Sequence, residues 1–196
     1  MFDMAQEPRG ATPAHPVDEF LGTAGEGIAC GTRIATAIGW RPVEAIAAGD
    51  PVLTFDHGMQ EVLRVERRAL WAGLTTPRAD WPLMVPAGAL GNRSEMVLLP
   101  GQSVLIESDL AEESFGDPFV LVRAMMLDGH RGITRIRPPV RVDIATLHFA
   151  RDEVVYANAG AMFLCGANAD LLSAPEVQGG YTVLPDWLAQ DFIDCL

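Results

Sequence analysis

A small set of residues in this chain could carry nucleophilic or proton-transfer chemistry. A cysteine thiol can attack a carbonyl carbon when a positioned histidine moves the protons, so cysteines and histidines are the first candidates. Cys30 could attack the neighbouring peptide, and His148 could donate the proton. Cys30 and His148 are therefore the candidate nucleophile and acid–base group. The other members of the set are Cys165, Cys195, His15, His57 and His130.

Each candidate also has a simpler structural interpretation, which we favour. Cys30 precedes a glycine and is then a small, half-buried thiol beside a turn. His148 lies in an alternating strand pattern, where it either faces solvent or packs with its hydrogen bonds satisfied. His57 lies in an Asp-x-Gly turn, where we expect it to be solvated, and His130 lies in a loop.

The spacing of the polar residues predicts no metal site and no cofactor. No Cys-x-x-Cys pair or Cys/His cluster is present. The glycines at residues 25–27 and 179–180 lack the strand-then-helix context and the lysine of a phosphate loop. Asp152 and Glu153 are adjacent in a strand pattern, so their side chains should point to opposite faces rather than form a carboxylate pair.

Length and charge narrow the classes of function. The 196 residues suit one domain, and 14 cationic against 26 acidic residues give a net charge of −12, which argues against binding the nucleic-acid backbone. The arginines of residues 64–68 and 131–141 alternate with apolar residues, as strand faces do. With no signal peptide and no apolar run of membrane length, we expect a soluble protein, cytoplasmic or exported without a cleaved signal peptide.

Short strand-like segments separated by turn residues fill most of the chain and predict a mainly β domain. Helical turns are expected at residues 41–46 and 123–127. The predicted strands are residues 33–36, 51–55, 61–65, 82–85, 96–99, 104–106, 119–122, 140–149 and 153–157.

Near the C-terminus the pattern changes to helical spacing. Leu184, Trp187, Leu188 and Phe192 are apolar and are interleaved with aspartates, which predicts a short helix. Such a stripe usually packs on the core of its own domain, and we favour that interpretation. The alternative is that this helix contacts another protein, which makes it the partner surface that the sequence offers.

Five stretches of the chain match, in order, the motifs of one known family. GTRIATAIGWRPVEAIAAGDPVLTFDHG opens the series, with its G-T-x-I, R-P-V-E and G-D-x-V-x-T elements. PLMVPAGALGN, residues 98–106, FVLVRAMML and TLHFARDEVVYANAG follow. Together they resemble bacterial Hint domains, of the Hedgehog/intein type, over about residues 27–160.

The resemblance implies a Hint-like β horseshoe with pseudo-twofold hairpins, to which the chain adds the short C-terminal helix. It divides the chain into a flexible arm (residues 1–16), the Hint-like β domain (17–165) and a C-terminal extension with the helix (166–196). Active relatives cleave their own backbone. A Cys or Ser at the first position attacks the preceding carbonyl, and a His in the second block polarises the amide and protonates the departing nitrogen.

Four positions that carry this chemistry in relatives hold other residues here. The first position is Gly27, which has no nucleophile. In the second block the polar residue is Leu99 and the His is Gln102, whose amide carries no titratable proton at neutral pH. A further His, in the last block, is Asp152. We therefore expect no catalytic residues, and we treat these four positions as a former site.

The hypothesis that we favour is a non-enzymatic, degenerate Hint-like domain with a structural or protein-interaction role. One alternative is a self-cleaving Hint domain that uses Cys30, with His148 as proton donor. Another is a β-barrel binding module whose resemblance to the family is accidental. A Hint-like fold should bring Gly27, Gln102 and Asp152 together, and Gly27→Cys with Gln102→His should then fold, at a cost near 1 kcal/mol for the cysteine.

Overall fold

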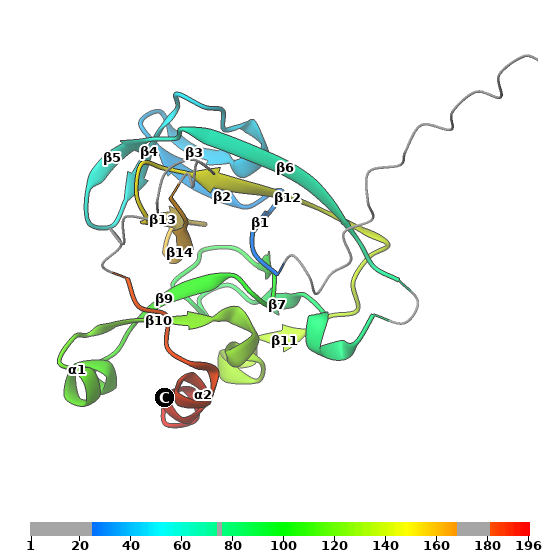
Figure 1. Cartoon of the computed structure of the whole chain (residues 1–196). Helices are drawn as coiled ribbons and strands as arrows, with labels where there is room; N and C mark the ends of the chain where they lie inside the picture. Colours follow the sequence, from blue (N-terminus) through cyan, green and yellow to red (C-terminus); the bar gives the residue numbers. More distant parts are fainter. Residues whose placement is uncertain (1–24, 74–75, 168–180) are drawn as a thin grey trace, which may run out of the picture.

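The computed structural model describes residues 25–73, 76–167 and 181–196, which form two antiparallel sheets (Figure 1). The mainly β class predicted from the sequence is confirmed. The arm predicted at residues 1–16, with His15, and the glycine pair at 179–180 lie outside the described residues.

Sheet A has the strand order β11-β7-β8-β1-β12-β6, and its longest ladder joins β12 to β6. In Figure 1 these two strands run together along the top of the molecule, away from the helices. The strands of sheet A are β1 (Ile28–Ala29), β6 (Arg64–Trp71), β7 (Leu83–Val85), β8 (Met96–Leu98), β11 (Thr134–Arg135) and β12 (Arg141–His148).

Sheet B has the order β10-β9-β14-β13-β2-β4-β5, and β3 also pairs with β2. Its strands are β2 (Arg33–Thr36), β3 (Gly39–Pro42), β4 (Pro51–Thr54), β5 (Gly58–Glu61), β9 (Ser103–Glu107), β10 (Phe119–Arg123), β13 (Glu153–Ala157) and β14 (Ala161–Cys165). The helices are α1 (Asp109–Phe115) and α2 (Asp186–Asp194), with 3-10 turns η1 (Val43–Ala45), η2 (Arg78–Asp80), η3 (Ala124–Leu127) and η4 (His130–Gly132). None of the described helices has the length and apolar character needed to cross a membrane.

The single strand predicted at residues 61–65 is wrong, because the chain passes from sheet B to sheet A at that point. β5 ends before Val62, which is fully buried and donates its N–H to the Asp50 carbonyl at 3.0 Å. The next N–H, of Leu63, donates to the His148 carbonyl at 2.8 Å, on β12. The backbone therefore passes from sheet B to sheet A between Val62 and Leu63, and the next strand, β6, pairs with β12.

The elements that were not predicted are β1, β3, β11, β14 and α1, together with the 3-10 turns η2 and η4. Ser108 caps α1 because its hydroxyl accepts the Leu110 N–H at 3.1 Å. Gly116 ends the helix in the left-handed conformation, with φ of 77°. β14 fills the gap between β13 and β9, so it completes sheet B.

The C-terminal helix packs on the core of its own domain. Phe192 of α2 is buried in the main hydrophobic core, and Leu184, just before the helix, packs against that core. Leu184 also donates its N–H to the Leu121 carbonyl of β10 at 2.8 Å. Of the predicted partner surface, Leu188 is half-buried and Trp187 is 67% exposed, so contact with a partner stays a prediction that now rests mainly on Trp187.

Candidate functional site

Three of the four positions singled out from the sequence meet around one cavity. Gly27 precedes β1, Gln102 precedes β9 and Asp152 precedes β13, and all three line a cavity of about 220 Å³. The remaining walls come from β9, β12 and β14. The β1–β12 ladder, in which Ile28 pairs with Ala145, sets Gly27 against the middle of β12. The expected convergence is therefore observed.

At the first position, a side chain on Gly27 would be strained and would displace a neighbour. Its φ is +135°, a conformation that residues with a side chain rarely adopt. A Cβ added there would lie 2.8 Å from Ile144 Cδ1 and 3.4 Å from Thr146 Oγ1. The positive φ that raises the cost of Gly27→Cys is observed, and the Ile144 side chain must shift to admit the cysteine, so the cost should exceed about 1 kcal/mol.

The chain that leads into Gly27 packs closely on the second block. A Cβ on Gly101 would lie 2.3 Å from the Gly25 carbonyl oxygen, so the two backbones touch only because position 101 has no side chain. The carbonyl of Glu26 lies 3.5 Å from the Arg68 guanidinium, at the limit of a hydrogen bond. The peptide that active relatives cleave is thus held against the domain.

Gln102 serves the backbone of the domain. Its side chain is buried, and Nε2 donates to the Leu164 carbonyl at 3.0 Å and to the Ser103 carbonyl at 3.1 Å. Both amide hydrogens are therefore used, and the one on Leu164 joins the second block to β14. The side chain ties two segments together and carries no titratable proton.

Leu99, the fourth position, does not line the cavity. Its side chain is fully buried in an apolar cluster with Leu70, Val142 and Ile144. The position that is polar in active relatives has become part of the core, where a hydroxyl would be costly to bury.

Asp152 and Glu153 point to different partners, as expected for adjacent strand residues. Asp152 Oδ1 accepts the Ala167 N–H at 2.8 Å. Glu153 is 1% exposed, and its carboxylate lies 2.9 Å from His57 Nδ1 and 3.6 Å from Arg151 Nε. His57 is exposed, as expected from the sequence, but its Nδ1 also lies against this buried carboxylate.

The cavity also contains two nucleophilic groups that the sequence did not place there, Cys165 and Thr146. Cys165 is buried, and burial raises the pKa of its thiol to about 12, so the reactive thiolate does not form at neutral pH. The Thr146 hydroxyl is buried and has no hydrogen-bond partner. No histidine lines this cavity, and the Asp152 carboxylate in its lining accepts the Ala167 N–H.

Cys30 lies at a different cavity, of about 250 Å³, together with Met84 and Asn158. Its thiol is exposed, yet partial burial raises the pKa, and the carboxylates of Glu44 and Asp143 raise it further. Arg67 acts in the opposite direction. No histidine lines this cavity either.

The structure does not bring His148 to the same cavity as Cys30. His148 is half-buried on β12, with Nε2 at 3.3 Å from Arg64 Nη2 and 3.8 Å from Glu66 Oε1. Burial, and then the charge of Arg64, lower the pKa of the imidazole. Over residues 25–73, 76–167 and 181–196, no three His, Cys, Asp or Glu side chains are grouped so as to hold a metal ion.

Comparisons with known proteins agree with this geometry. The family model of the Hint domain matches residues 27–162, so the match begins at the residue assigned to the first position. The solution structure of a bacterial intein-like domain from Clostridium thermocellum is similar, with 20% identity, a TM-score of 0.44, and coverage of 72% of this chain and 98% of that chain. The gp41-1 intein has 13% identity and a TM-score of 0.42, and the match covers 71% of this chain and 97% of that chain. The MchDnaB-1 intein has 12% identity and a TM-score of 0.42, and the match covers 69% of this chain and 98% of that chain. No curated protein gives a significant match.

Proposed function

The chain belongs to the Hint domain family, and from that premise we propose that it is a Hint domain that does not cleave its own backbone and has a structural or protein-interaction role. Family membership removes the alternative of an accidental resemblance. One observation carries the proposal. The cavity where the blocks meet has Gly27 at the position of the nucleophile and no histidine in its lining.

Self-cleavage has requirements that this cavity does not meet. The attack forms a bond between a side-chain sulfur or oxygen and the preceding carbonyl carbon, and the departing nitrogen must receive a proton. Gly27 supplies no such atom, and Gln102 holds its amide hydrogens on two carbonyls. Cys165 keeps its thiol protonated, since burial raises its pKa to about 12. The scaffold is kept while the reacting groups are gone.

An interaction role is supported by the C-terminal helix. Trp187 exposes 67% of its surface on a helix whose other face is fixed to the core by Phe192. A large aromatic side chain held on a rigid element is a common anchor in protein interfaces.

The proposal is tested by the mass of the intact protein. We expect one unchanged species after prolonged incubation with dithiothreitol or hydroxylamine, which trap thioesters and esters, while an active Hint domain treated in parallel yields two fragments. Cleavage between Ala29 and Cys30 that disappears in Cys30→Ala would overturn the proposal and establish the enzyme that uses Cys30. Because the thiol of Cys30 is exposed, this substitution leaves the core intact.

A further inference from the structure

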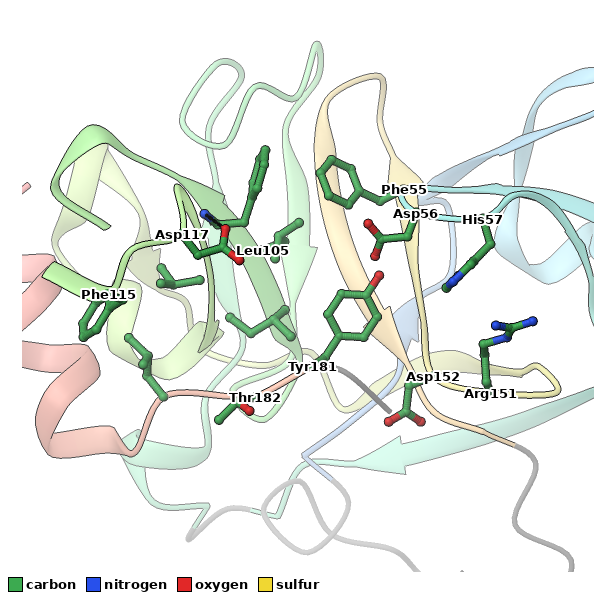
Figure 2. A pocket seen from close by; sticks show the side chains of 14 residues that line it. Phe55, Asp56, His57, Leu105, Phe115, Asp117, Arg151, Asp152, Tyr181 and Thr182 are labelled. Carbon is green, nitrogen blue, oxygen red and sulfur yellow. Dashed lines mark hydrogen bonds between the residues drawn. The ribbon is translucent and has the colours of Figure 1, made fainter. Parts of the chain in front are cut away.

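We propose that a second cavity, against sheet B, binds a lysine side chain of a partner protein. The cavity measures about 620 Å³ and lies between residues 55–57, the end of α1 and residues 181–184 (Figure 2). That volume is typical of sites for small organic groups. The inference goes beyond the proposed function, because binding here does not depend on whether the chain cleaves itself.

Aromatic rings form one wall of this cavity. Phe55 and Phe119 meet edge to face with ring centroids 4.8 Å apart. Figure 2 shows the Tyr181 ring reaching into the cavity, with its hydroxyl pointing toward the turn that carries Phe55 and Asp56. Aromatic faces pack an alkyl chain and attract the ammonium group at its end.

The charge that the cavity presents is negative. Its two basic residues, His57 and Arg151, both lie against the buried carboxylate of Glu153, whose single negative charge offsets that of the Arg151 guanidinium. In the part of the chain that the structure describes, no salt bridge reaches the aspartates that line the cavity, which are Asp56, Asp117 and Asp152.

Asp56 and Tyr181 together define the kind of group that fits. Asp117 and Asp152 each accept a backbone N–H, but the Asp56 carboxylate has no hydrogen bond to any described residue. The Tyr181 oxygen is buried and likewise has no partner among the described residues. The buried Tyr181 oxygen is unfavourable without a hydrogen bond, whereas Asp56 is an exposed carboxylate. The site therefore favours a ligand that donates to the phenolic oxygen and brings a positive charge to Asp56. A lysine ammonium has three donors and no acceptor.

The partner rather than the chain itself must supply that lysine. The sequence contains no lysine, and all its side-chain cations other than histidine are arginines. A net charge of −12 also favours association with a basic protein.

The test titrates the full chain with capped lysine (N-acetyl-lysine N-methylamide) and follows the backbone amide shifts by NMR. Capped norleucine is the matched probe, since it keeps the alkyl chain and lacks the ammonium. We expect saturable shifts around residues 55–57, 151–152 and 182 with capped lysine, and binding at least about tenfold weaker with capped norleucine. Equal binding of the two probes, or shifts spread over other surfaces, would overturn the proposal.

Two variants locate the site. Asp56→Asn should weaken the binding of capped lysine about tenfold, and Tyr181→Phe should weaken it severalfold while keeping the ring. The control Asp191→Asn removes the same charge from exposed α2 and should leave the affinity unchanged. An Asp56→Asn variant with the native spectrum and native affinity would refute the assignment. Because cleavage is measured separately by mass, failure here leaves the proposed function standing.

Discussion

The cavity beside Gly27 holds about 220 Å³ and the cavity beside Tyr181 about 620 Å³, and they differ most in how their polar side chains are bonded. In the smaller one, Gln102 and Asp152 are bonded to backbone groups of the domain. In the larger one, the Asp56 carboxylate and the Tyr181 hydroxyl have no such bonds within the described ranges. Asp152 lines both cavities and so marks their shared wall.

This difference shows that a cavity can be lined by polar side chains that serve the fold itself. In the smaller cavity, the side chains of Gln102 and Asp152 join neighbouring segments through hydrogen bonds to the backbone. Thr146 is the exception, because its buried hydroxyl has no partner. The substitutions below test whether the smaller cavity is now structural and the larger one is open to a ligand.

The largest effect is expected from Leu99→Thr, the change that would return a polar residue to the second block. Leu99 is fully buried among Leu70, Val142 and Ile144, so threonine loses apolar contact and buries an unpaired hydroxyl. We expect the free energy of unfolding to fall by about 3 kcal/mol, measured by urea denaturation. Leu99→Met, which keeps the volume, should cost less than about 1.5 kcal/mol. Equal costs for the two would mean that the position is not tightly packed.

A smaller loss is expected for Gly27→Cys, about 2 kcal/mol in the same assay, from the positive φ and the 2.8 Å approach to Ile144 Cδ1. Ile144→Val removes that methyl group, and alone it should cost about 1 kcal/mol. The double variant should lose about 1 kcal/mol less stability than the sum of the two single variants, because the clash is gone. Strict additivity would show that backbone strain, and not β12, limits the position.

The fold could be predicted where local patterning decides it. Residues 33–36 and 153–157 form strands because their apolar residues and the flanking turns suffice to define them. The change of sheet at Val62 could not be predicted, since it depends on hydrogen bonds to Asp50 and His148 from distant parts of the chain. Helix α1 spans seven residues, too short for its periodicity to stand out, although Ser108 and Gly116 at its ends were readable signals.

Some residues of the candidate site could likewise be predicted from the sequence, and others could not. Gly27, Gln102 and Asp152 could be placed together because the order of the family blocks implied it. The pairing of His57 with Glu153, 96 residues apart, left no local signal. Asp56, in the Asp-x-Gly turn, and Tyr181 are likewise brought together only by the fold. Sequence patterns therefore located the cavity at which the family blocks meet and missed the larger cavity beside Tyr181.

The smallest effects compare the two unpaired hydroxyls directly. Thr146→Val keeps the β-branched shape and removes a buried hydroxyl without a partner, so we expect the free energy of unfolding to rise by about 1 kcal/mol. Tyr181→Phe should change it by less than about 0.5 kcal/mol, because the ring stays and the hydroxyl holds no bond in the described structure. A loss of stability in Thr146→Val would instead indicate a bound water that satisfies the hydroxyl inside the smaller cavity. A loss in Tyr181→Phe would mean that the fold itself uses the phenol. If both hydroxyls prove dispensable for stability, only the substitution at Tyr181 should weaken the binding of capped lysine, because only that hydroxyl faces a carboxylate without a partner.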